Sequence, residues 1–539
     1  MVSRCRVVLL IWGMISFTVV AAEAPPQVQD NAEHYAVGKI IVLSNPIFDE
    51  SADNAIFLHH WANALHINTR EHVIRDRLSF HEGDDVTRKQ LDEAQRILRA
   101  EPYLRDAKIT VAKPDPSSDA SSDSVNILVE TWDQWSLLPT VDFGRTGGQN
   151  KFSLGIKDDN ILGLGIQSQF EYQSDENRTG YRFNFKSAVT WVDHGQIAGD
   201  FHSNDDGNSS YLAFKKPFYT LSDERAYGVS YARNNRLNTF RQNGQDLSQY
   251  RELLKQNSLF WGFKFAETSD TRQRLLFGIT QDFHDFETDY YTRKPLPQDR
   301  EYLYPWMQWE YLQDDFVVMQ NVHLINFNED INLGWHHIGR MGIETHDNDG
   351  LGYHFWWDTS RGYSSDQQLI LFNFDMQLTQ GTEQPDYFKV GGDAEYFYRF
   401  TPKWSAYSHF RVISSQNRYL DWPLGLGDDT GVRGYPNQFQ LGDHQWLFTA
   451  EVRNYPNINL YQLAELGWVA FVDVGRAFGG DLAADNEVKG VIGALGVGAR
   501  IYSSRSSYGN VVHIDFSMPF NNSNHVNGWE WRFEVKRHF

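Results

Sequence analysis

Apolar and polar residues alternate along most of the chain, from Trp135 to the C-terminus. Between residues 512 and 518, for example, every second side chain is apolar, and the side chains between them are those of His513, Asp515 and Ser517. Successive side chains of a β-strand point to opposite faces, so a period of two predicts strands with one apolar and one polar face. We therefore expect region 135–539 to fold as a series of β-strands.

The last predicted strand shows this alternation clearly. Its apolar face carries Trp529, Trp531, Phe533, Val535 and Phe539, and most of the residues between them are charged. A water-soluble β-sandwich also alternates, but 405 residues of strand without a helical layer, with aromatic-rich apolar faces, favour a barrel with a wet lumen. At about 25 residues for each strand with its connection, region 135–539 predicts an all-β transmembrane barrel of about 16 antiparallel strands.

A mixed pattern precedes this region. Residues 35–44 and, later, 104–113 and 124–131 read as strands, whereas 69–80 and 85–101 place apolar residues at helical spacing. The second predicted helix begins with a capping box formed by Thr87 and Gln90. The order β–α–α–β–β predicts a small α+β domain over residues 35–133.

The N-terminus has the organisation of a secretory signal peptide. Arg4 and Arg6 precede an apolar run of 14 residues, 7–20, which is too short to span a bilayer, and small residues end at Ala22. We expect residues 1–22 to be removed, leaving a short N-terminal segment, 23–34, before the α+β domain. Cys5 is the only cysteine, so the mature chain is expected to carry no thiol.

Charge and motif content narrow the function classes. The net charge of −21 argues against a nucleic-acid partner, because phosphate binding needs clustered Lys and Arg. No nucleophile motif or dinucleotide motif with the required context occurs, so we expect neither an enzyme nor a cofactor. The histidines at 59, 60, 66 and 72 lack metal-ligand spacing and indicate surface histidines, and 346–350 is an incomplete calcium loop. We therefore expect no metal site.

One cation stands out in the glycine-rich loop 427–446. Arg433 lies between Val432 and the pair Gly434–Tyr435, and a secluded guanidinium needs a carboxylate partner. Downstream, Phe471, Asp473 and Gly475 share one face of a predicted strand. If the loop folds inward, Arg433 can meet Asp473 in a bidentate pair while Gly475 leaves space for it, with a gross attraction of about 4 kcal/mol. The alternative is an exposed loop arginine without a fixed partner.

The sequence VRGY at 432–435, followed by FVDVG at 471–475, resembles the paired signature of the bacterial surface antigen superfamily. That superfamily includes the BamA/TamA-like outer-membrane insertases and the two-partner secretion transporters. Segments 158–165, 493–504 and 511–520 resemble its barrel strands, and 70–111 resembles a POTRA module. The resemblance implies that the VRGY loop lies inside the barrel, with Arg433 against Asp473. Only one POTRA-like module fits before Trp135, which is fewer than the insertases and secretion transporters carry.

The resemblance also implies a function and a place in the cell. We expect a barrel in the outer membrane of a Gram-negative bacterium, with its POTRA-like domain in the periplasm, that assists insertion or translocation of polypeptides. The first strand, near 137–144, and the last, 529–539, would form a seam that templates a client strand. The alternatives are an export pore of the two-partner type and a non-catalytic surface-loop binding or structural barrel. Expected partners are outer-membrane lipid, a client polypeptide and accessory periplasmic proteins.

Overall fold

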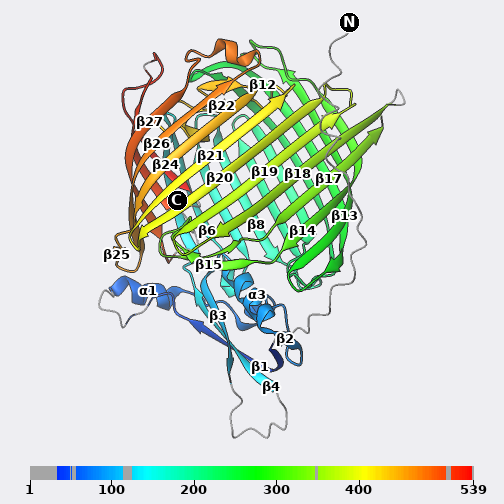
Figure 1. Ribbon diagram of the computed structural model, residues 1–539, viewed down its shortest axis with the longest axis vertical. Coiled ribbons are helices and arrows are strands. Elements are labelled where there is room, and N and C mark those ends of the chain that lie inside the picture. Colours follow the sequence, from blue (N-terminus) through cyan, green and yellow to red (C-terminus); the bar gives the residue numbers. More distant parts are fainter. Residues whose placement is uncertain are drawn as a thin grey trace.

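The computed structural model describes residues 33–48, 50, 56–112, 124–345, 350–505, 511–521 and 523–536. Residues 1–22, predicted as a signal peptide, and Phe539 of the last predicted strand lie outside this part of the chain. The described residues form a closed barrel with a small mixed unit beneath one of its ends (Figure 1). We call the barrel end beside this N-terminal unit the proximal end and the opposite end the distal end.

The N-terminal unit is a four-stranded sheet of order β2–β1–β4–β3, in which β1 and β4 run parallel. Its strands are β1 (His34–Asn45), β2 (Asp85–Thr87), β3 (Leu104–Ala112) and β4 (Ser124–Asp133). Its helices are α1 (Phe57–Leu65), α2 (Glu71–Arg75) and α3 (Arg88–Arg99). Among the described residues, no helix is long and apolar enough to cross a membrane.

Helix α3 forms where the sequence predicts it. The Thr87 hydroxyl accepts from the Gln90 amide at 3.3 Å, and the Gln90 side chain accepts from the Thr87 amide at 2.8 Å, so the predicted capping box is confirmed. The apolar face of α3 places Leu91, Ala94 and Leu98 in the core of the unit, where each is at most 1% exposed.

Helix α1 was not predicted, and two of the histidines near it are buried. His59 is fully buried: its ring stacks on Phe48 at 4.4 Å, and its Nε2 lies 2.7 Å from the Tyr461 carbonyl of a barrel turn. The buried His66 side chain pairs with Asp133, with 3.0 Å between Nε2 and Oδ2. The prediction of surface histidines is therefore wrong for these two, because tertiary contacts that local sequence does not reveal cover them.

Over the described residues, 20 antiparallel strands form the barrel wall, and the two-residue β25 (Asn459–Leu460) pairs at the proximal end of β26. The wall strands are β5 (Leu137–Thr146), β6 (Gln149–Asp158), β7 (Gln167–Ser174), β8 (Thr179–Ala188), β9 (Gln196–Asn204), β10 (Gly207–Lys216), β11 (Arg225–Gln242), β12 (Gln245–Glu267), β13 (Thr271–Thr288), β14 (Arg300–Gln313), β17 (His336–Thr345), β18 (Leu351–Ser364), β19 (Gln368–Gln380), β20 (Tyr387–Thr401), β21 (Trp404–Gln416), β24 (His444–Asn454), β26 (Ala464–Phe478), β27 (Ile492–Ser503), β28 (Val511–Pro519) and β29 (Glu530–Lys536).

The predicted barrel class is right, but the predicted number of about 16 strands is wrong. The reason lies in the connections. Strands β5 and β6 are 10 residues long each and are joined by the two residues Gly147 and Gly148. Strands β9 and β10 follow each other as closely. A strand with its connection therefore uses about 20 residues rather than 25, because many turns are tight.

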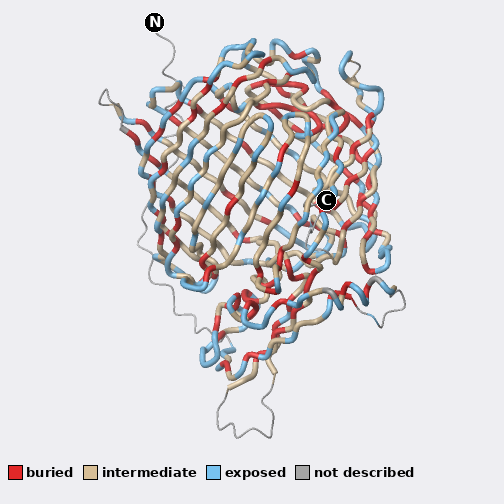
Figure 2. Tube along the Cα trace, turned by 180° about the vertical axis from the view of Figure 1, so that it is seen from behind, coloured by how far each residue is buried: buried red, intermediate tan, exposed pale blue. Residues whose placement is uncertain are grey.

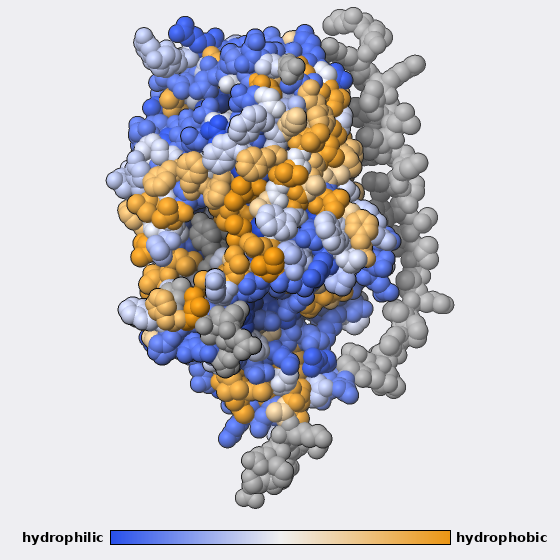
Figure 3. Space-filling view, turned by 90° about the vertical axis from the view of Figure 1, so that its left-hand side faces the viewer, coloured by the Kyte–Doolittle hydropathy of each residue, from blue (hydrophilic) through white to orange (hydrophobic). Residues whose placement is uncertain are grey.

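The outer surface of the barrel is apolar at mid-height. Exposed apolar side chains occur on strand after strand, including those of Val141, Leu154, Leu259, Ile279, Val497 and Phe516. Figure 3 shows an apolar band between polar ends on one side of the molecule. The wall closes into a barrel, and an apolar band of this kind suits hydrocarbon, so the barrel is built to span a membrane.

Two segments that connect wall strands place some of their residues in buried positions inside the barrel, and Figure 2 shows buried stretches of the trace within both ends of the barrel. The first, which we call the inward loop, is 417–443 at the distal end; it contains β22 (Leu424–Leu426), the single turn η3 (Asp428–Thr430) and β23 (Gln440–Gly442). The second, which we call the proximal hairpin, is 316–332; it contains β15 (Phe316–Gln320) and β16 (Asn328–Asn332).

Candidate functional site: the inward loop and the barrel seam

Arg433 of the inward loop is 6% exposed and lies against the inner wall. Its Nε donates to Asp473 Oδ2 at 2.7 Å and its Nη2 to Asp473 Oδ1 at 2.8 Å, while its backbone amide lies 3.3 Å from the same carboxylate. Asp473 on β26 is fully buried and also accepts from the Thr449 hydroxyl on β24 at 3.0 Å. The structure thus brings the arginine of the VRGY sequence and the aspartate of the FVDVG sequence together.

Two further carboxylates surround the Arg433 guanidinium, and the sequence analysis did not assign them to it. Glu451 on β24 lies 3.0 Å from its Nη2, and Asp515 on β28 lies 3.9 Å from its Nη1. Asp515 is in turn 2.6 Å from Nη1 of Arg500 on β27. The alternation along β24 and β28 places both acids on polar faces, but only closure of the barrel brings those faces together.

Phe471 and Gly475 flank Asp473 on the inner face of β26, but they have different neighbours. The Arg433 guanidinium lies 3.4 Å from the centre of the Phe471 ring, a cation–π contact. A Cβ added to Gly475 would come within 2.7 Å of the Trp446 carbonyl and 3.0 Å of Leu426. Gly475 therefore leaves space for β22 of the inward loop and for β24, rather than for Arg433 as predicted.

The other residues of the VRGY sequence fix the loop around Arg433. Val432 and Tyr435 are fully buried, and the Tyr435 hydroxyl lies 2.9 Å from the Gly493 carbonyl and 2.8 Å from Asn521 Oδ1. Gly434 has φ +88°, and a Cβ at this position would come within 2.8 Å of the Ser517 hydroxyl. Only glycine adopts this conformation without strain and also fits against β28.

Asp428 connects the inward loop to both strands of the barrel seam, β5 and β29. Its Oδ2 accepts from the amide of Gly147, which directly follows β5, at 2.7 Å. Its Oδ1 accepts from the Gly434 amide at 3.2 Å and lies 3.7 Å from Nη1 of Arg532 on β29. Both Asp428 and Arg532 are at most 3% exposed, so this contact is shielded from solvent.

The seam itself is paired unevenly on its two sides. Strand β29 pairs with β28 over its whole length, from Glu530 opposite Ser517 to Lys536 opposite Val511. Among the described residues, its pairing with β5 is in register only where Phe533 lies opposite Arg145. Backbone pairing therefore contributes much less on the β5 side than on the β28 side.

Several side-chain contacts join β5 and β29 across the seam. Arg145 of β5 donates to Glu530 at 2.8 Å, and its guanidinium lies 5.5 Å from the Trp531 ring. Phe143 lies 6.3 Å from the rings of both Trp531 and Phe533. Of the other residues predicted at the seam, Val535 lies on β29, and Trp529 immediately precedes it and is 65% exposed.

The proximal hairpin reaches the same ionic cluster from the other end of the barrel. Its tip residue Ile325 is fully buried and packs with Tyr455, Tyr502 and Val511. The Val322 carbonyl accepts from Arg453 Nη1 at 3.3 Å, and Arg453 Nε lies 2.8 Å from Glu451. Because Glu451 also contacts Arg433, one chain of charged groups links the proximal hairpin to the inward loop.

The N-terminal unit contacts this hairpin through α3. Arg99 makes a bidentate pair with Asp330 of β16, at 2.9 Å and 2.5 Å, and the Arg96 guanidinium lies 3.7 Å from the centre of the Phe316 ring. The Arg99 and Asp330 side chains are 7% and 15% exposed. The unit is thus attached to an element that itself enters the barrel.

This attachment yields a mutational prediction. We expect Arg99→Ala to loosen the N-terminal unit, because it leaves the shielded Asp330 carboxylate unpaired, at a cost of about 1–3 kcal/mol. Limited proteolysis should then cleave between the unit and the barrel at lower protease concentration. Arg88→Ala is the matched control, since Arg88 of the same helix is 54% exposed and pairs with Asp92 of α3, and it should change cleavage little. Equal sensitivity of the two variants would contradict this assignment.

A second contact between α3 and the barrel, at the connection between β10 and β11, contains a buried acid and predicts a pH effect. Glu93 of α3 is 6% exposed and accepts from the Leu221 amide at 2.6 Å; burial raises the pKa of this carboxyl above its ordinary value. A carboxyl with a raised pKa contributes stability below its unfolded pKa, and that contribution is lost as the pH rises through its folded pKa. We expect Glu93→Gln to raise the unfolding temperature of the N-terminal unit at pH 8 and to leave it unchanged at pH 4. A lower unfolding temperature at pH 8 would contradict this.

Comparisons with known proteins give low similarity throughout. No protein-family model matches the chain, and no curated protein sequence matches it. Among solved structures, the chain is similar to BamA from Haemophilus ducreyi lacking POTRA domains 1–3, with 10% identity, 93% of this chain and 84% of that chain covered, and a TM-score of 0.38. It is also similar to CdiB from Escherichia coli, with 11% identity, 97% and 93% covered, and a TM-score of 0.47.

A third similar structure is the FrpB iron transporter from Neisseria meningitidis, with 10% identity, 81% and 88% covered, and a TM-score of 0.42. Similarity at this level concerns the barrel architecture and carries no argument about function.

Proposed function

We propose that the protein is an outer-membrane barrel that assists insertion or translocation of polypeptides, by templating strands rather than by bond chemistry. The N-terminal unit is then a POTRA-like domain in the periplasm, and the distal end faces the cell exterior. The observation that carries the proposal is the uneven pairing of β29, which is continuous with β28 and in register with β5 at a single position. A client strand can add to a sheet edge that becomes free when such a seam opens.

The inward loop supports this proposal because it contacts the seam from inside. Asp428 touches both sides of the seam, through Gly147 and Arg532, and Arg433 anchors the same loop to β24 and β26. A loop held in this way supports a seam that has little backbone pairing of its own. The role of the Arg433–Asp473 pair is accordingly to position the loop.

The experiment that tests the proposal is a reversible lock on the seam. The sequence has one cysteine, at position 5, so paired cysteines introduced into the mature chain have no competitor. We would oxidise Arg145→Cys with Phe533→Cys, the pair in register across the seam, in liposomes, and follow folding of an added denatured outer-membrane barrel polypeptide. The matched control is Val497→Cys with Phe516→Cys, which face each other on β27 and β28.

We expect the oxidised seam variant no longer to promote folding of the added polypeptide, and reduction of its disulfide to restore this activity. The control variant should promote folding in both the oxidised and the reduced state. Full activity with the seam locked would overturn the proposed mechanism. It would then favour the second candidate, an export pore that carries the polypeptide through the lumen.

A specific observation favours that second candidate. Between the proximal hairpin and the inward loop lies a polar cavity of about 470 Å³, lined by residues that include His323, Glu395, Arg411, Thr430 and Lys536. A second cleft of about 660 Å³, with both polar and apolar lining residues, lies between the N-terminal unit and strands β7 to β10. The cavity and the cleft would both belong to a path through the barrel if the inward loop and the proximal hairpin moved aside.

A further inference from the structure

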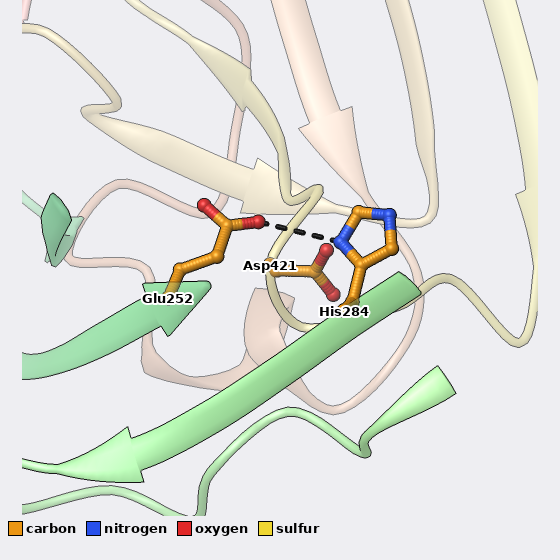
Figure 4. A group of neighbouring side chains, drawn as sticks. All are labelled: Glu252, His284 and Asp421. Carbon is orange, nitrogen blue, oxygen red and sulfur yellow. Dashed lines mark ion pairs between the residues drawn. The ribbon is translucent and has the colours of Figure 1, made fainter. Parts of the chain in front are cut away.

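Three side chains with metal-binding groups converge near the distal end of the barrel, on the wall opposite the Arg433 cluster in the strand order (Figure 4). Glu252 comes from β12, His284 from β13 and Asp421 from the inward loop, and one potential ligand atom from each lies within 4.8 Å of the other two. Glu252 and His284 are 3% and 2% exposed, and the Asp421 side chain is 1% exposed. The group is therefore closed off from bulk water.

His284 is oriented as a ligand would be. Its Nε2 lies 3.3 Å from Asp282 Oδ1, and its Nδ1 faces Glu252 Oε1 at 3.4 Å. Neither contact has hydrogen-bond geometry, since Nδ1 and Asp282 Oδ1 are both buried without a hydrogen-bond partner among the described residues. Histidines that bind metals typically have one ring nitrogen on the ion and the other held by a carboxylate or carbonyl.

The two carboxylates are also held by outer partners. Arg300 donates to both oxygens of Asp421, at 2.9 Å and 2.7 Å. Arg236 and Asn238 donate to Oε2 of Glu252, at 3.3 Å and 2.6 Å, which leaves Oε1 directed at His284. Each carboxylate oxygen has a second lone pair, so these hydrogen bonds orient the acids without using up their capacity to bind an ion.

We propose that Glu252, His284 and Asp421 bind one divalent transition-metal ion of the Zn²⁺ class. One imidazole nitrogen and two carboxylate oxygens form a three-residue set that leaves a fourth position for water. With bonds of about 2.1 Å, neighbouring ligands of a tetrahedral ion lie about 3.4 Å apart. The 3.4 Å between Glu252 Oε1 and His284 Nδ1 fits this geometry. Ca²⁺ and Mg²⁺ fit less well, because they prefer sets of six or more oxygen ligands.

The ion would fasten the first half of the inward loop to the wall. Its ligands come from two wall strands and from Asp421, twelve positions before Arg433 in the inward loop. Arg433 itself fastens the second half of the inward loop to β24 and β26. The loop would then be held at two separate places on the wall. This inference does not depend on the function proposed above.

Zinc titration of the purified protein tests the site. The probe is Zn²⁺ alone, added to chelator-treated full-length protein without an affinity tag, with bound metal measured by competition with a chromophoric chelator. His284→Gln removes Nδ1 while its amide nitrogen can still reach Asp282, and Glu252→Gln removes one anionic ligand. His354→Gln is the matched control, because His354 pairs with Glu344 at 3.0 Å without a third ligand from the loop.

We expect one Zn²⁺ per chain in the wild type and in His354→Gln, and at least about tenfold weaker binding in His284→Gln and Glu252→Gln. Absence of bound zinc in the wild type, or equal binding in all four proteins, would overturn the proposal and favour a protonated imidazole paired with Glu252 and Asp282. If the two ligand variants do not fold, anomalous diffraction at the zinc edge from wild-type crystals decides: density between the three side chains supports the site, and its absence there overturns it.

Discussion

Replacing Arg433 by alanine is expected to reduce sharply the amount of folded barrel in the membrane. The substitution leaves the buried carboxylates of Asp473 and Glu451 without their shared cation, and removing one partner of a buried ion pair typically costs about 3–5 kcal/mol. Asp473→Ala should have a similar effect, because it leaves a buried guanidinium without its bidentate partner. The measurement is the fraction of protein that shows heat-modifiable gel mobility.

The double variant separates a specific pair from two independent contributions. If Arg433 and Asp473 act as one interaction, the variant that lacks both is no worse than either single variant, since neither member of the pair is left buried without the other. Arg293→Ala serves as the control, because Arg293 is exposed in a distal connection, and it should leave the folded fraction unchanged. Simple addition of the two single effects, or a silent Arg433→Ala, would contradict the structural role of this pair.

The second large effect is expected at Asp428. Asp428→Ala removes the contact between the inward loop and the two seam strands and leaves Arg532, 3% exposed, without this carboxylate. We expect the folded fraction to fall and the amides of β5 and β29 to exchange with solvent faster, because the seam loses its support from inside. Asp429→Ala is the control, since the neighbouring Asp429 is exposed.

The two aspartate variants distinguish the position of the carboxylate from its charge. Both remove one negative charge from the same turn of the inward loop, so a general electrostatic effect would change both proteins equally. Faster exchange in Asp428→Ala alone supports the contact through Gly147 and Arg532. Identical exchange in both variants would show that Asp428 does not support the seam.

Much of the wall could be predicted from the sequence, because a strand between water and lipid must alternate. The outward side chains of β28 and β29, such as Phe516, and the inward ones, such as Asp515, lie on the faces that the period of two predicts. The number of strands could not be predicted, because it depends on how tight the turns are. Helix α1 was missed because the contacts that bury His59 come from a barrel turn about four hundred residues later in the chain.

The candidate site could also be predicted only in part, because most of its contacts join residues that are distant in the sequence. A motif resemblance could suggest Asp473 for Arg433, but Glu451 and Asp515 are indistinguishable by pattern from other polar residues on inward faces. They meet Arg433 only because β24, β26, β27 and β28 are consecutive in the closed wall. The convergence of Glu252, His284 and Asp421 likewise needs the inward loop to cross to β12 and β13. Local sequence carries no signal for either arrangement.

The claim that the barrel opens at its seam is tested most directly by hydrogen exchange in lipid nanodiscs. The exchange of β29 amides is measured in the wild-type protein and in the oxidised Arg145→Cys, Phe533→Cys variant. Alternate amides of β29 point toward β28 and toward β5, so each strand pair can be followed separately. We predict that the amides directed at β5 exchange faster than those directed at β28, and that oxidation of the Arg145→Cys, Phe533→Cys pair slows them. Equal protection of both sets, unaffected by the disulfide, would mean that the seam is as firmly closed as the rest of the wall, and would contradict a barrel that opens there.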